Sequence, residues 1–263
     1  MSFDLCQVRM AEKPYYIENI GKHIYSIEEL CFYLYRNIYL IDETIVNEVL
    51  CDWIRDELGL RKLYNQMYEH LEKKDGIAYF ITPIFREIGY LPADRLREYQ
   101  ENLSRLDVQP GDTRQKLKGD YLVRCGMYSN AIAEYYHVLE RQNPGNLGAR
   151  FYSEIWNNLG CAYARLFQFS DAADCFKKAW KMSGTKETLR KYVSVLPLFL
   201  TEQEYAERIG ELNADPVLVG NIQEYNLKAA AGAKAREEER KDRPEPEAAL
   251  QALKDEYRRG AGV

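Results

Sequence analysis

The segment from Trp156 to Ala179 constrains the fold of this chain more than any other stretch of the sequence. Trp156, Leu159 and Tyr163 are spaced i, i+3 and i+7, which places them on one face of a helix. Gly160 carries no side chain and lets a neighbouring helix approach this face closely. After a short turn, a second helical face carries Ala172, Phe176 and Ala179. The spacing therefore predicts an antiparallel helical hairpin with these residues in its core.

This pattern resembles the Trp-x2-Leu-Gly-x2-Tyr…Ala-x3-Phe signature of the tetratricopeptide repeat (TPR). A degenerate copy precedes it, in which Gly119 and Ala131 have the same twelve-residue separation as Gly160 and Ala172. A loop rich in Pro, Gly and Asn at 142–148 lies between the copies, and the period is 41 residues (119 to 160). The family period is about 34 residues.

A third and weaker hairpin is expected over residues 189–212, where Pro197 should kink or shorten the first helix. With it the resemblance covers about residues 112–213. The resemblance implies an all-α fold, a TPR-like solenoid of stacked helical hairpins with a groove that binds partners. Three hairpins reach the number that such arrays need for stability.

Residues 1–110 carry no repeat signature, and we expect an all-helical domain there. Ser26 and Glu29 form a capping box that opens a helix. Asp42 is expected to cap the next helix. The segment 15–20 is expected to be extended or to form a short docking arm. Further helices are expected over residues 45–54, 60–71, 77–88 and 94–106.

Residues 111–227 are expected to hold the TPR-like hairpins and a capping helix after Pro216. After residue 227 the composition of the chain changes. Residues 228–263 are expected to form a charged, partly flexible helical tail that is interrupted at Pro244. This tail has nine basic and eight acidic residues, and such a balance argues against a dedicated nucleic-acid or membrane arm.

The composition favours a soluble, cytoplasmic protein. The net charge of −5 gives no general attraction to nucleic acid. No apolar run approaches the roughly 20 residues that span a bilayer, and residues 1–10 lack the pattern of a signal peptide. The six cysteines show no metal-ligand spacing and sit in helical patterns, as expected in a reducing compartment. We therefore expect no metal, no cofactor, no nucleic acid and no membrane as partners.

The chain shows none of the motifs that usually carry catalysis. It has no phosphate-binding Gly loop, no HExxH and no GxSxG. Its three histidines are isolated, and Cys125 beside Arg124 is better explained by packing than by an activated thiol. We expect a protein that is not an enzyme. The alternative from another class is an enzyme with a site built from scattered residues of the N-terminal helical domain.

The resemblance to the TPR family implies which residues bind the partner, because the first helix of each repeat lines the groove. The residues at these positions, or one to two turns further along, are Lys116, Arg124, Asn157, Asn158, Arg165, Arg190 and Lys191. Cations and amides suit a carboxylate, since they supply charge-assisted hydrogen bonds. The set resembles the clamp with which co-chaperones grip an acidic C-terminal peptide. Asp120 departs from that clamp, because it stands where the family has Asn and would repel a carboxylate.

These observations predict a protein-interaction scaffold or adaptor that binds a peptide or protein partner in the concave TPR groove. The occupant is expected to be an acidic or extended peptide. One alternative is a co-chaperone-like adaptor that grips an acidic C-terminal peptide. Another is that the charged positions of the groove are only solvated surface residues.

Overall fold

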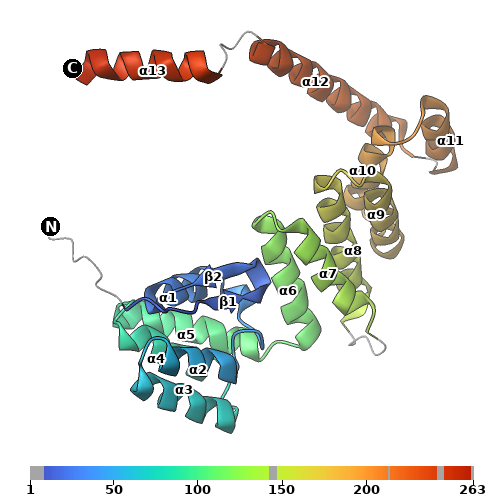
Figure 1. Ribbon diagram of the computed structural model, residues 1–263. Helices are drawn as coiled ribbons and strands as arrows, with labels where there is room; N and C mark the ends of the chain where they lie inside the picture. The colour runs from blue at the N-terminus through green and yellow to red at the C-terminus, as the bar shows by residue number, and fades with distance from the viewer. Residues whose placement is uncertain (1–8, 142–146, 213, 242–245, 262–263) are drawn as a thin grey trace. The chain divides into compact units, whose positions relative to one another are not determined.

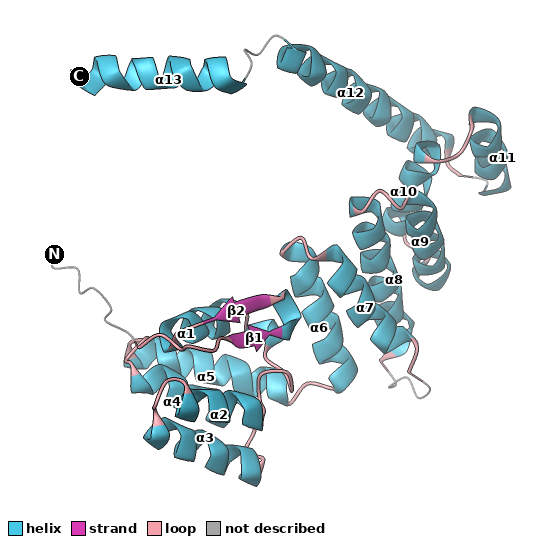
Figure 2. Cartoon of the chain, viewed as in Figure 1, coloured by secondary structure: helices cyan, strands magenta, loops and turns pink. Residues whose placement is uncertain are grey.

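The computed structural model describes residues 9–141, 147–212, 214–241 and 246–261, and it shows an all-helical chain (Figure 1). Over these residues the chain has thirteen α-helices, three short 3-10 helices and one pair of strands (Figure 2). Contacts between residues divide it into two compact units, 1–183 and 184–263. Within the described ranges, no helix combines the length and the apolar character needed to cross a membrane.

The first unit begins with a small antiparallel hairpin of strands. Strand β1 (Tyr15–Ile17) pairs with β2 (Lys22–Ile24), with Tyr16 opposite His23. A 3-10 helix, η1 (Glu18–Ile20), and a left-handed Gly21 close the turn between them. The prediction of extended chain is thus confirmed for the three residues of β1, whereas residues 18–20 form η1, and the second strand, β2, was not predicted.

Five helices follow and pack consecutively from α2 to α5. The N-cap of the first is confirmed, because Ser26 Oγ accepts the backbone N–H of Glu29 at 3.2 Å. The second bond of a capping box is shifted by one residue, since the Glu29 carboxylate accepts the N–H of Tyr25 at 2.6 Å. The prediction that Asp42 caps the next helix is wrong. The N-cap of α2 is Asn47, whose side chain accepts the N–H of Leu50 at 2.9 Å. The elements are α1 (Ile27–Arg36), η2 (Ile38–Leu40), α2 (Glu48–Asp56), α3 (Arg61–Lys73), α4 (Ile77–Glu87) and α5 (Ala93–Asp107).

Two helical hairpins complete the first unit. They consist of α6 (Gly111–Arg124) with α7 (Tyr128–Leu139), and of α8 (Gly148–Arg165) with α9 (Phe169–Ser183). A β-carbon on Gly119 would lie 2.7 Å from the ring of Tyr135, and one on Gly160 would lie 2.6 Å from the ring of Phe176. Both glycines are therefore needed for the close approach of paired helices, as the spacing predicted.

The hairpins share their core with the N-terminal helices. Helix α8 contacts both α6 and α7, and α6 contacts η2. One cluster of buried apolar side chains runs from Ala11 to Cys175 without a break at residue 110. The first unit is thus a single packed body.

Where a third hairpin was predicted, the second unit has two helices, α10 (Lys186–Val195) and α11 (Glu202–Leu212). Helix α10 ends before Pro197, as predicted, and the 3-10 helix η3 (Leu196–Leu198) follows it. Helix α10 packs against α12 (Pro216–Lys241), whereas α11 buries none of its side chains. The last helix is α13 (Pro246–Ala261). The predicted set of hairpins is therefore divided between the two units.

Three further predictions concern residues that lie wholly or mostly outside the ranges that the structure describes. The loop predicted at 142–148 falls mostly outside the described residues, as do Pro244 and the first eight residues of the chain.

Candidate functional site

A polar network joins the first helices of the two hairpins, and we call it the α6–α8 network. It consists of Lys116 and Asp120 on α6 and of Asn157 and Asn158 on α8. Asp120 is its centre: Lys116 Nζ lies 2.8 Å from Oδ2, and Asn158 Nδ2 donates to Oδ1 at 2.7 Å. Asn157 Nδ2 in turn donates to Asn158 Oδ1 at 2.9 Å. Hydrogen bonds therefore cross from one hairpin to the next.

Asp120 also has a partner beneath the surface. The hydroxyl of the fully buried Tyr135 donates to Asp120 Oδ1 at 2.6 Å. Burial raises the pKa of Tyr135, and the nearby Asp120 carboxylate raises it further. The phenol thus stays protonated and serves as a donor. Lys116 Nζ also lies 3.5 Å from Glu154 Oε2. The carboxylates of Asp120 and Glu154 therefore balance the charge of one half-buried ammonium group.

Three of the seven residues predicted to bind a partner lie in this network: Lys116, Asn157 and Asn158. Arg124 lies apart from them, with its guanidinium 5.3 Å from the ring centre of Tyr121. Arg165 is exposed at the end of α8. The remaining two belong to the second unit, where Arg190 is exposed and Lys191 Nζ lies 3.4 Å from Glu187 Oε1.

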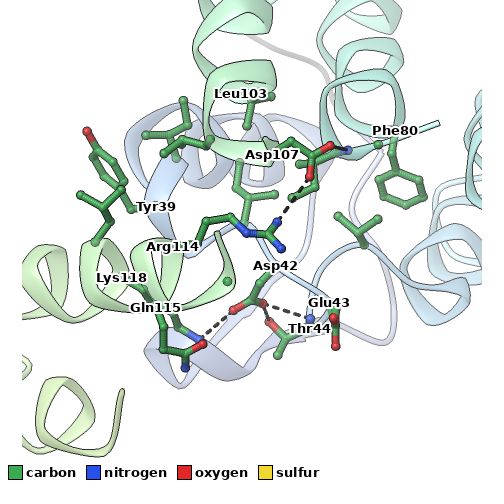
Figure 3. Close-up of a pocket in the computed structure, with 18 of the residues that line it drawn as sticks. Tyr39, Asp42, Glu43, Thr44, Phe80, Leu103, Asp107, Arg114, Gln115 and Lys118 are labelled. Carbon is green, nitrogen blue, oxygen red and sulfur yellow. Dashed lines mark hydrogen bonds and ion pairs between the residues drawn. The ribbon is translucent and has the colours of Figure 1, made fainter. Parts of the chain in front are cut away.

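A pocket of about 760 Å³ forms where the N-terminal helices meet α6 (Figure 3). Its wall includes the segment 38–46, the end of α3, the start of α4, the end of α5 and the first half of α6. Both apolar and charged side chains line it. The apolar wall includes Val46, Leu71, Phe80, Leu103, Leu106 and Leu117. A cavity of this size and lining is in the range of ligand-binding pockets, about 300–1,000 Å³.

One side of the pocket is held by an ion-pair bridge, the Lys118 bridge. Lys118 Nζ lies 2.7 Å from Asp42 Oδ2 and 2.8 Å from Glu134 Oε1, which connects the segment 38–46 to α6 and α7. Burial alone would raise the pKa of Asp42, but the hydrogen bonds from Lys118 and Thr44 outweigh burial and keep this pKa below its usual value. Burial likewise opposes the charge of Lys118, and the two carboxylates outweigh it and raise the lysine pKa. Asp42 and Lys118 are therefore both charged near neutral pH.

The other side of the pocket is organised by Asp107. Its carboxylate accepts the backbone N–H of Ile77 at 3.2 Å and lies 3.3 Å from Arg114 Nη1, as Figure 3 shows. Gly76 makes room for this contact, because a β-carbon there would lie 2.5 Å from Asp107 Oδ2. Asp107 thus stabilises the N-terminus of α4 and orients a guanidinium at the pocket.

The described residues offer little reactive chemistry. They contain no cluster of His, Cys, Asp and Glu that could hold a metal ion. Burial raises the pKa of the thiols of Cys31, Cys51 and Cys175 to about 12, which keeps them protonated. His70 Nδ1 lies 2.8 Å from Asp75 Oδ2 at the pocket, but no hydroxyl or thiol in the described part of the chain hydrogen-bonds to this imidazole. A nucleophile–base pair is therefore not formed there.

Comparison of the chain with protein-family models, with curated proteins and with solved structures finds no match. The sequence does not predict the pocket, because residues of several separate elements form its wall. The one local signal was the pair of acids at Asp42 and Asp107, each at or next to the end of a predicted helix.

Proposed function

We propose that this chain is a protein-interaction scaffold or adaptor, whose hairpins stack like TPR units and bind an extended peptide segment along α6 and α8. One observation carries the proposal: α6/α7 and α8/α9 have the same construction and touch through their first helices. In each, a helix glycine faces an aromatic ring sixteen residues later, at Gly119–Tyr135 and Gly160–Phe176. Repeated hairpins that touch in this way form extended binding surfaces in repeat proteins.

The α6–α8 network favours a particular kind of ligand. Asn157 and Asn158 carry amides, which both donate and accept hydrogen bonds and so match the N–H and C=O groups of an extended peptide backbone. Lys116 is already paired with Asp120, and its second neighbour is Glu154. An acidic group that approached Lys116 would meet these two carboxylates. The geometry thus gives more support to an extended peptide held through its backbone than to the co-chaperone-like alternative with an acidic C-terminal peptide.

Affinity capture from a cell lysate, with the bound proteins identified by mass spectrometry, tests this proposal. The variant Asn157→Ala combined with Lys116→Met removes an amide and a charge from the face. We expect the affinity for a captured partner to fall by about tenfold or more, as for other residues important to an interface. The matched control is Lys181→Met, which removes an exposed lysine from α9. Circular dichroism and thermal unfolding show whether each variant is folded.

The outcomes separate the alternatives. Capture that is unchanged in the folded double variant would show that the α6–α8 face is not the binding surface. Synthetic peptides from the sequence of a captured partner are then made in two forms, one with a free and one with an amidated C-terminus. Fluorescence anisotropy compares the affinities of the two forms. Equal affinities agree with backbone-directed binding. A strong preference for the free carboxylate would instead favour the co-chaperone-like alternative.

A further inference from the structure

The pocket between the N-terminal helices and α6 carries charges of both signs beside its apolar wall. The charged residues that line it are the cations Lys74, Arg114, Lys118 and Arg141 and the acids Asp42, Glu43 and Asp107. A ligand with a single charge would be attracted by one part of this wall and repelled by another. The charges that remain without a full set of partners therefore decide which ligand the pocket suits.

Several of these charges are compensated within the chain. The Lys118 bridge joins a lysine and an acid of the wall, and Arg141 pairs with Asp112. Asp42 also accepts hydrogen bonds from the backbone N–H of Thr44 at 3.0 Å and from its hydroxyl at 2.6 Å. These groups fix the shape of the wall and have little capacity left for a ligand.

Three charged groups of the wall keep such capacity. Lys74 and Glu43 are exposed, and neither forms an ion pair with any residue that the structure describes. Arg114 donates from Nη1 to Asp107 at 3.3 Å, which uses one of the five N–H groups of a guanidinium. Figure 3 shows this guanidinium in the middle of the pocket, with Asp107 on one side and Asp42 on the other. The wall thus offers both cationic donors and an anionic acceptor to a ligand.

Lys74 has a backbone conformation that favours glycine. Its φ is +55°, one of two positive values among the described residues other than glycine. It ends α3 as a left-handed cap, a position that glycine usually occupies. Strained residues of this kind persist mainly at sites where they serve a function. A lysine at this position places an ammonium group at the pocket, which glycine could not supply.

We propose that the pocket binds a short peptide of about two or three residues with both termini free and an apolar side chain. Its carboxylate pairs with Arg114 and Lys74, and its ammonium group pairs with Glu43. Its apolar side chain packs against Phe80 and Leu103, which are buried in the wall. Only a ligand with charges of both signs satisfies these groups together. The site is separate from the peptide surface proposed above, because no residue of the α6–α8 network lines the pocket.

Isothermal titration calorimetry of the full-length chain with leucyl-leucine tests the proposal. We expect saturable binding of this dipeptide. Acetylation of its amino group and amidation of its carboxyl group should each weaken binding by about tenfold or more, since each removes one charge-assisted contact. Glycyl-glycine keeps both charges but lacks the apolar side chains, and it should bind more weakly still. No saturable binding of leucyl-leucine, or equal affinities for the free and the blocked dipeptides, would overturn the proposal.

Two variants then assign the charges of the ligand to the wall. Lys74→Gly removes the ammonium group and suits the left-handed cap, so this variant should melt no lower than the wild type while it binds leucyl-leucine about tenfold or more weakly. Glu43→Gln should weaken binding to a similar extent. The controls Lys73→Met and Glu72→Gln remove exposed charges of α3 that do not line the pocket, and they should bind like the wild type.

The blocked dipeptides provide the matched readout. The amidated dipeptide has no carboxylate for Lys74, so Lys74→Gly should no longer change its affinity, whereas Glu43→Gln still should. The acetylated dipeptide should show the reverse pattern. A Lys74→Gly variant that binds leucyl-leucine like the wild type, or variants that weaken all the dipeptides equally, would contradict the assignment of the two charges and with it the proposed ligand.

Discussion

Gly160 shows how one residue sets the distance between two helices. A β-carbon there would lie 2.6 Å from Cε1 of Phe176, whose buried ring has little room to move. Gly160→Ala should therefore force the helices apart, and we expect it to lower the free energy of unfolding by about 1–3 kcal/mol, as overpacked cores do. Urea unfolding followed by tryptophan fluorescence measures this change.

The control for this prediction is Gly210→Ala in α11. No heavy atom lies within 4 Å of the β-carbon position at Gly210, and alanine is the better helix former by about 1 kcal/mol. This variant should be neutral or stabilising. Equal destabilisation by both substitutions would mean that helix propensity, rather than the contact with Phe176, decides the effect.

The sequence predicted such packing residues because their spacing follows from the geometry of one hairpin. It could not predict the pairing within the α6–α8 network. Asp120 meets Asn158 from a position 38 residues earlier in the chain, at a distance of 2.7 Å. The resemblance to the TPR family implied one face for Lys116 and Asn158, but only the packing of α6 against α8 shows that they share Asp120 as a partner.

At the scale of elements, the Lys118 bridge holds the segment 38–46 against α6, and its strength depends on pH. The pKa of Asp42 is lowered from 3.8 in the folded chain, so its contribution is present above that value and is lost as pH falls through the folded pKa. The pKa of Lys118 is raised from 10.5, so its contribution is complete below that value and is lost as pH rises through the folded pKa. We expect the bridge to stabilise the first unit between about pH 4 and 10.

Lys118→Met tests this expectation through melting temperatures measured from pH 3 to pH 7. Near neutral pH it leaves two half-buried carboxylates without their cation, and we expect a loss of about 3 kcal/mol. The difference from the wild type should shrink as pH falls through the lowered pKa of Asp42, where this carboxyl takes up a proton in the wild type as well. The control Lys73→Met breaks an exposed pair with Glu69 and should leave the melting temperature almost unchanged. A pH-independent effect of Lys118→Met would contradict the role of the bridge.

Elements with local signals were predicted well, and those that depend on distant contacts were not. The helix after Ser26 follows from a capping box within four residues. Asp42 had the right residue type for a cap, but Lys118 binds it from 76 positions away, and Asn47 caps α2 instead. The local signal for the pocket is limited to Asp42 and Asp107, because the pocket exists only where the ends of α3 and α5 and the starts of α4 and α6 converge.

At the scale of the molecule, the apolar core explains why residues 1–110 and the hairpins form one unit. The loss of repeat character at residue 110 suggested a boundary there. The contacts across it are nonetheless specific. The hydroxyl of Tyr121 donates to the carbonyl of Arg36 at 2.8 Å, its ring lies 5.7 Å from that of Tyr39, and Lys118 binds Asp42. Helix α6 thus belongs to the core of both parts.

We therefore expect a fragment of residues 1–183 to fold on its own and to unfold in one cooperative transition. A fragment of residues 111–183 should be less stable, because it exposes the face of α6 that carries Tyr121 and Leu122, which pack into the shared core. Circular dichroism during thermal unfolding, with limited proteolysis of both fragments, measures the difference. Two separate transitions in 1–183, or equal melting temperatures for the two fragments, would show that the hairpins fold without the N-terminal helices. In that case the core shared by the two parts would add no stability to the hairpins. This would be unexpected, because burial of apolar surface normally stabilises a folded protein.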